Sequence, residues 1–368
     1  MRIPLIKPFI DERVKRRVLD VLESGYLAEG PVTAELETIC RDYIGCGHVV
    51  AVSSCTVGLE MALRCLHVGP GDEVIVPDYT YPATADAVAL VGARTIIVDV
   101  DPDTMLIDYD ALEAAIGSRT KAVIPVSLFG NPLDYDRLLE IKNRHGIYIL
   151  EDAACALGAE YRGRKVGSFS DITVFSLHPR KFITTGEGGL LATDRDSWAD
   201  WLRSYKKFGM ETGKDRAGTV FRRIGTNYKL SDVLAAIGLG QMESVKRLLE
   251  ERRYLAEKYI RLLKDTGAIR LPKTTTGGRH SFQSFCIFTP KRDEILLELR
   301  RKGIEVQIGT YSLHLQPAFA SSSQCEHRNG FSGSNFAYSH CMTLPLYHGM
   351  SEGKQREVVE AIVSCLGN

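Results

Sequence analysis

One lysine, Lys181, stands between a strand-like apolar run and a glycine-rich turn in the stretch FSLHPRKFITTGEGGLL (residues 175–191). Most lysines lie on solvated faces, and that explanation is possible here too. The alternative is a lysine held inside a site and used as an amine nucleophile, not as a charge. Polar groups at the ends of other strands decide between the two explanations.

Two acidic residues, Glu151 and Asp152, end the apolar run IYILED. An acid there can be a solvated loop residue, a metal ligand or a partner of a cofactor. The metal explanation is weak, because no histidine or further acid follows at ligand spacing. Tyr79 and Tyr81 follow another strand in VPDYTYPATADAV, where an aromatic ring can pack in the core or stack on a planar ligand.

The stretch SSCTVG places Ser54, Cys55 and Thr56 where a strand meets a helix. Backbone amides and the helix dipole favour an anion at such a position. Taken alone, a serine or threonine there is better explained as a helix cap. Ser176, five residues before Lys181, adds a hydroxyl group near the end of a further strand.

Taken together, these groups match the needs of pyridoxal phosphate (PLP). Its phosphate needs a helix N-terminus, its ring an aromatic face, its ring nitrogen a carboxylate and its aldehyde a lysine. The glycines of TTGEGGLLATD lead into a strand, whereas a dinucleotide fingerprint opens a helix after one. We therefore predict a PLP site and no dinucleotide site.

The elements that must position these groups alternate between strands and helices from residue 48 to about 195. Apolar, β-branched runs such as RTIIVDVD and KAVIPVSL are typical of buried parallel strands. This rhythm predicts an α/β fold whose mostly parallel central sheet is flanked by helices, with ligands beyond the carboxyl ends of the strands.

A long helical stretch after residue 228 leads into an α+β pattern. We predict a large PLP-binding domain over residues 1–245 and a smaller C-terminal domain over 246–368. The polar stretch ASSSQCEHRNGFSGSN (320–335) predicts a surface loop.

The composition excludes several classes of protein. Lys+Arg and Asp+Glu both number 46 in 368 residues, so the basic surface of a nucleic-acid-binding protein is absent. No apolar run approaches the ~20 residues of a membrane helix, and the first residues become charged too soon for a secretory signal. The nine cysteines form no C-x-x-C pair and are expected to be free thiols, which favours the reducing cytoplasm.

Nearly the whole chain resembles the sugar-nucleotide aminotransferases of the DegT/DnrJ/EryC1/StrS family, which have PLP-dependent transferase fold type I. The stretch from Glu151 to Gly189 is the most specific part of this resemblance. Further matching stretches are IPLIKPFID, LESGYLAEGPVTAELE, VAVSSCTVGLEMAL, DEVIVPDYTYPATADAV, VDVDPDTMLID, GTNYKLSDVLAAIGLGQME, LHLQPAF and LPLYHG.

The resemblance implies a role for each candidate residue. Lys181 bonds to the cofactor's aldehyde, Asp152 pairs with the pyridine nitrogen and Tyr81 stacks on the ring. The phosphate contacts are implied for Ser176, Thr56, the amide of Val57 and, from the other subunit of a homodimer, Asn227.

Two positions depart from the family pattern. The family usually has glycine in place of Cys55, which bears on how closely the backbone approaches the phosphate. It usually has glutamine or histidine in place of Cys155, where the side chain contacts the cofactor's ring hydroxyl. A thiol is a poor hydrogen-bond partner, so that contact is not expected here.

The implied activity is transfer of an amino group from an amino acid, glutamate, to a keto-sugar nucleotide. The form HPRKFITTGEGG is more similar to members that aminate C4 than to those that aminate C3. Members with histidine in place of the lysine are dehydratases, so Lys181 argues against that branch. Two alternatives remain: a PLP-dependent lyase on the same fold, and a regulatory protein that keeps PLP as a sensor, which a DNA gel shift would detect.

Overall fold

The fold is built on one large sheet, seen in a computed structural model that describes residues 2–211, 218–328 and 330–367. Within those residues the sheet has eight strands in the order β1-β10-β9-β6-β5-β2-β4-β17. The strands from β9 to β17 are parallel, β10 runs antiparallel to β9, and β1, paired antiparallel with β10, runs in the same direction as the other strands. The predicted mostly parallel sheet is confirmed. Its strands are β1 (His48–Val52), β2 (Glu73–Pro77), β4 (Arg94–Val98), β5 (Thr120–Val123), β6 (Tyr148–Asp152), β9 (Ile172–Ser176), β10 (Gly189–Thr193) and β17 (Cys325–His327).

Helices cover both faces of this sheet, because successive side chains of a strand point to opposite faces. Val49 and Ala51 of β1 belong to one apolar cluster, and Val50 and Val52 to another. The first cluster includes residues of α2 (Pro31–Ile44), α5 (Tyr109–Ala115), α6 (Tyr135–His145) and α8 (Asp232–Met242). The second includes residues of α3 (Cys55–Cys65), α4 (Ala83–Leu90) and α7 (Asp196–Tyr205).

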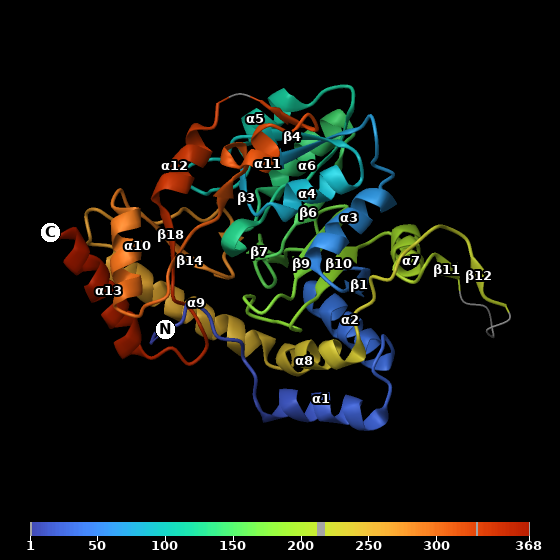
Figure 1. The fold of residues 1–368 in the computed structure, drawn as a ribbon, viewed down its shortest axis with the longest axis horizontal. Coiled ribbons are helices and arrows are strands. Elements are labelled where there is room, and N and C mark those ends of the chain that lie inside the picture. Colours follow the sequence, from blue (N-terminus) through green and yellow to red (C-terminus); the bar gives the residue numbers. More distant parts are fainter. Residues whose placement is uncertain (1, 212–217, 329, 368) are drawn as a thin grey trace.

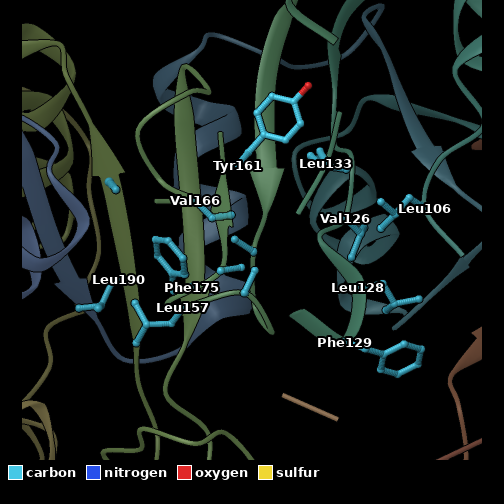
Figure 2. Close-up of a cluster of buried hydrophobic side chains, with 14 of the residues drawn as sticks. Leu106, Val126, Leu128, Phe129, Leu133, Leu157, Tyr161, Val166, Phe175 and Leu190 are labelled. Carbon is cyan, nitrogen blue, oxygen red and sulfur yellow. The ribbon is translucent and has the colours of Figure 1, made fainter. Parts of the chain in front are cut away.

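The first cluster supports the strands that carry the predicted site. Figure 2 shows Phe175 of β9 and Leu190 of β10 beside Leu157, which follows β6 in the chain. These side chains are almost completely buried. Packing of this kind fixes the strand ends on which Asp152, Ser176 and the loop of Lys181 depend.

A second body lies at the other end of the molecule, beside the C-terminus (Figure 1). The small sheet β14-β18-β15 forms its centre, and its strands are β14 (Phe285–Phe288), β15 (Gln307–Ile308) and β18 (Cys341–Leu344). Its helices share a third apolar cluster and are α9 (Val245–Leu263), α10 (Arg292–Arg301) and α13 (Glu352–Leu366). Here α9 runs from the large body into the small one, and the predicted α+β pattern is present.

The segment between β15 and β18 returns to the large sheet. There β16 (Tyr311–Ser312) pairs with β3 (Tyr79–Thr80), and β17 pairs in parallel with β4. The predicted surface loop over 320–335 is therefore wrong for β17 and for the start of α12 (Ser332–His340). An edge strand needs only backbone pairing on one side, so its polar composition is tolerated, and Glu326 ion-pairs with Arg94 at 3.1 Å. The division into 1–245 and 246–368 stays a prediction.

The remaining elements are short, apart from α1, which packs against α8. They are α1 (Glu12–Ser24), α11 (Pro317–Ala320), η1 (Leu128–Gly130), η2 (Leu313–Leu315), β7 (Glu160–Tyr161), β8 (Arg164–Lys165), β13 (Gly278–Arg279), β11 (Met210–Glu211) and β12 (Val220–Phe221). In Figure 1, β11 and β12 lie away from the main body, beyond α7.

Candidate active site

A cavity of about 670 Å³ lies at the carboxyl ends of β6 and β9. Its wall combines residues of the large body, with Tyr311 of β16 among them, and Gln307, Thr343 and Leu344 from the small body. Among the predicted site residues, Thr56, Tyr81, Asp152, Ser176 and Lys181 line this cavity, whereas Val57 and Asn227 do not. Five of the seven are thus brought together in one place.

Lys181 lies in the loop between β9 and β10, and its Nζ donates a hydrogen bond to Cys155 Sγ at 3.0 Å. Burial would lower the pKa of Lys181, but the charge and hydrogen bond of Cys155, with Cys55 and Asp152, raise it above its ordinary value. The structure thus places Cys155 against the lysine itself.

Two glutamines hold the loop on either side of this lysine. Gln283 donates from Nε2 to the carbonyl of Arg180 at 2.6 Å and accepts at Oε1 from the amide of Phe182 at 3.0 Å. Gln241 of α8 accepts from the amide of Thr184 at 3.1 Å and donates to its carbonyl at 3.0 Å. Both glutamines are buried.

Sequence reasoning missed both of these glutamines. The only signal was a polar residue within an apolar context, in SFQSF for Gln283 and in LGQME for Gln241. That signal does not show which backbone groups the amide will meet.

Asp152, the last residue of β6, is fixed by two hydrogen bonds. Thr84 Oγ1 donates to its Oδ2 at 2.8 Å, and the amide of Ala154 donates to its Oδ1 at 3.1 Å. Burial raises the pKa of Asp152, while these two bonds and the charge of Lys181 act in the opposite direction. A carboxylate held this way suits a cationic partner in the cavity.

Glu151 faces the opposite side of β6 and is buried in the core. It accepts hydrogen bonds from Ser127 and Tyr135 at 2.6 Å each, and from Ser170 at 2.9 Å. Its hydroxyl partners are structural, so of the two acids only Asp152 is available to the cavity.

The N-terminus of α3 opens toward the same cavity. Ser54 caps the helix, accepting from the amide of Val57 at 3.3 Å. The first amides of a helix lack acceptors within it, which makes this end suitable for an anion. A Cβ on Gly189 would lie 2.7 Å from the carbonyl atoms of Ser54, so β10 passes this helix end closely only because that residue is glycine.

The two tyrosines take different roles. Tyr79 is 1% exposed, and its hydroxyl accepts from the amide of Thr310 at 3.1 Å, so it is a core residue. Tyr81 is 65% exposed and lines the cavity, with its ring centroid 6.3 Å from that of Tyr311. The ring of Tyr81 is thus free to pack on a planar ligand.

Asn227 is exposed, and its Oδ1 accepts from Lys229 Nζ at 2.5 Å. It follows β12 in the chain and does not line the cavity of its own chain. In the described part of the chain, no group of three or more histidine, cysteine or acidic side chains could hold a metal ion.

Comparison with known proteins decides the family. The model of the DegT/DnrJ/EryC1/StrS aminotransferase family matches residues 8–363. The chain belongs to this family. It is 34% identical over 372 residues to the GDP-perosamine synthase of Caulobacter vibrioides, covering 98% of this chain and 97% of that protein. It is 33% identical over 383 residues to the UDP-4-amino-4-deoxy-L-arabinose–oxoglutarate aminotransferase of Shewanella sediminis, covering 100% and 98%.

Solved structures agree with this assignment. The DegT DnrJ EryC1 StrS aminotransferase from Brucella abortus is 33% identical, with a TM-score of 0.90 over 97% of this chain and 96% of that one. Spr1654 of Streptococcus pneumoniae in its PLP form is 29% identical, with a TM-score of 0.92 over 99% and 98%. The predicted fold type I and PLP-dependent aminotransferase activity are confirmed.

The residues present fit the cofactor of this aminotransferase. The cavity offers an amine, a buried carboxylate, an exposed aromatic ring and a helix N-terminus approached by a glycine. These are the groups that PLP requires. Within the described ranges, no helix has the length and apolarity to cross a membrane.

Proposed function

We propose that this aminotransferase transfers the amino group of glutamate to C4 of a keto-sugar nucleotide, for the synthesis of amino sugars in a surface polysaccharide or glycoside. The observation that carries the proposal is the half-buried Lys181 amine, which shares a cavity of about 670 Å³ with the buried Asp152. Such a volume accommodates a cofactor together with part of a large substrate. The Shewanella relative's name pairs a 4-amino sugar nucleotide with oxoglutarate, the keto acid that corresponds to glutamate.

PLP, when bound, supplies an electron sink and carries the amino group between the two substrates. We propose that Lys181 holds the cofactor and, once released by the incoming amine, moves a proton between the reacting carbon atoms. Asp152 keeps a proton on the ring nitrogen, and its bonds to Thr84 and Ala154 keep its carboxylate aimed. Tyr81 covers one face of the ring.

We assign the cofactor's phosphate to the N-terminus of α3, through Thr56 and the amide of Val57, with the hydroxyl of Ser176. The bond from the Val57 amide to Ser54 Oγ, at 3.3 Å, is long enough for an incoming oxyanion to replace it. Ser176 Oγ accepts from the amide of His178 at 3.3 Å, so its own proton is available for donation.

We propose a homodimer in which Asn227 reaches the phosphate bound by its partner. Asn227 does not line the cavity of its own chain. The neighbouring segment exposes apolar side chains, with Ile224 96% and Phe221 63% exposed. A second copy packed on this segment would cover them. We also place the enzyme in the cytoplasm, where the free thiols at its site, Cys55 and Cys155, stay reduced.

The test is a screen of keto-sugar nucleotides with glutamate, in which mass spectrometry detects the amino product and oxoglutarate. Lys181→Ala serves as the inactive control. We expect a 4-amino sugar nucleotide for one substrate of the set. Release of ammonia or elimination products instead would support a lyase, and binding to DNA in a gel shift would support a regulator.

A further inference from the structure

Arg180 is exposed at the wall of the cavity, and within the described residues its guanidinium group keeps hydrogen-bond donors that no other side chain uses. Arg180 directly precedes Lys181 and lines the same cavity. Its Nη1 donates to Gln307 Oε1 at 3.0 Å. Among the residues that the structure describes, no carboxylate oxygen lies within 4.0 Å of its guanidinium. A guanidinium has five N–H donors, and a neutral amide uses only one of them.

Both ends of Arg180 are nevertheless held in place. Its carbonyl accepts from Gln283, and its amide donates to His178 Nδ1 at 3.2 Å. Gln307 lies on β15 of the small body, where its carbonyl accepts from Thr343 Oγ1 at 3.3 Å. The arginine therefore reaches from the lysine loop to the small body, and its bond to Gln307 orients the guanidinium before any ligand arrives, which lowers the entropic cost of binding.

Neither acid of the cavity wall forms an ion pair with Arg180 among the described residues. Asp152 is committed to Thr84 and Ala154. Glu187 is 3.9 Å from His178 at the cavity wall and forms no ion pair with Arg180 within the described residues. Arg180 is thus not ion-paired to either acid, and the planar fork of an arginine fits the two oxygens of a carboxylate or phosphate.

We propose that Arg180, held by Gln307, forms a subsite for an oxyanion of the substrate. Two groups have this chemistry: a carboxylate of the amino-acid donor and a phosphate of the sugar nucleotide. The identity of these two substrates rests on the proposed function. The binding of an anion at Arg180 is argued from the cavity residues alone.

The test measures the two ligands separately on the PLP-loaded enzyme. Glutamate is titrated while the absorbance of the bound cofactor is followed, and UDP and GDP are titrated by calorimetry. Glutamate binding and nucleotide binding are the two arms of this test. We expect Arg180→Gln to weaken the binding in one arm by roughly 10- to 100-fold, as for the loss of a charged bidentate bond. Weaker glutamate binding assigns the carboxylate, and weaker nucleotide binding assigns the phosphate. Arg180→Lys keeps the charge without the fork and should show a smaller loss in the same arm.

A second variant leaves the lysine loop unchanged. Gln307→Glu places a carboxylate against the guanidinium, competes with the substrate oxyanion and should weaken the same arm as Arg180→Gln. Gln307→Ala removes only the support and should weaken it less. Arg203→Gln, on α7 outside the cavity, is the control and should change neither arm.

Unchanged dissociation constants, within twofold in both arms for Arg180→Gln and Gln307→Glu, would overturn the proposal. The sugar screen is independent of these measurements. If no keto-sugar nucleotide is aminated while Arg180→Gln still weakens glutamate or nucleotide binding, the proposed substrate is wrong and the anion subsite stands.

Discussion

The amine of Lys181 lies 3.0 Å from the sulfur of Cys155, which is 26 residues earlier in the chain. Burial disfavours the charged form of a lysine, and yet the pKa of Lys181 is raised, because Cys155, Cys55 and Asp152 stabilise its charge. The thiol that departs from the family pattern is therefore a partner of the lysine. Its removal should change the ionisation of the amine.

We expect Cys155→Ala to lower the pKa of Lys181 in the cofactor-free enzyme. A lower pKa leaves more free amine at any pH below it, so Lys181 should be methylated faster by formaldehyde and cyanoborohydride at pH 8–9. The rate should rise about tenfold for each unit by which the pKa falls. Peptide mass spectrometry across a pH series gives the midpoint for this lysine.

Two further variants serve as controls for the midpoint measured at Lys181. Cys155→Ser keeps a hydrogen-bond acceptor that does not ionise in this range and should give an intermediate midpoint. Cys365→Ala, on α13, should leave the midpoint unchanged. An identical midpoint in Cys155→Ala and the parent enzyme would show that the thiol does not stabilise the ammonium group.

Asp152→Asn should reduce turnover far more than cofactor retention. A neutral amide cannot hold a proton on the ring nitrogen, whereas the aromatic and phosphate contacts remain. We expect kcat to fall by on the order of 100-fold or more, with the cofactor still bound after desalting. A kcat within a few-fold of the parent value would remove Asp152 from this role.

Glu151→Gln provides the matched comparison on the same strand. The Glu151 carboxylate accepts from several buried hydroxyl groups, and an amide would direct its own N–H donors at some of them. We expect a loss of about 1–3 kcal/mol in the free energy of unfolding, while kcat stays within a few-fold. Thermal unfolding and steady-state kinetics separate the two effects.

Gln283→Glu should impair catalysis because Gln283 fixes the peptide groups on both sides of Lys181. The carboxylate keeps the bond to the Phe182 amide but repels the carbonyl of Arg180. A displacement of the lysine by about 1 Å costs up to roughly 100-fold in rate, so kcat should fall ten- to hundredfold. Gln241→Glu makes the same change at Thr184, three residues further on, because it keeps the bond to the amide and loses the bond to the carbonyl. Gln241→Glu should lower Tm by about as much as Gln283→Glu does, but it should reduce kcat less than threefold. Equal losses of kcat in the two variants would mean that both glutamines act through stability alone.

The sequence could predict two kinds of feature: elements with a clear hydrophobic pattern, and residues whose chemistry matches a cofactor. Strands such as β4 and β6 follow from continuous apolar runs, and Lys181, Asp152 and Ser176 follow from their places at strand ends. Parallel strands bring such ends to one edge, which is why these residues meet in one cavity.

Contacts between distant segments could not be predicted in this way. The strand β17 could not be predicted, because an edge strand is held by backbone hydrogen bonds and its side chains need no apolar pattern. Gln283 and Gln307 act through backbone and side-chain partners on the lysine loop more than 100 residues away in the chain. Nothing local to either glutamine specifies those partners, so the support of the lysine loop is visible only in the structure.

Asn227 gives the last prediction, which tests the shared site. If it serves the partner's phosphate, each site combines Lys181 of one chain with Asn227 of the other. Asn227→Asp should impair the neighbouring site, because a carboxylate repels the phosphate, while Lys181→Ala should inactivate its own. When the two inactive variants are unfolded and refolded together, a mixed dimer regains one intact site and places both substitutions in the other. Random pairing of equal amounts makes roughly half of the dimers mixed, so activity should recover to roughly a quarter of the parent value. Each variant refolded alone is the control, and different affinity tags confirm that mixed dimers form. Mixed dimers without recovered activity would show that Asn227 acts within its own chain or has no part in the site.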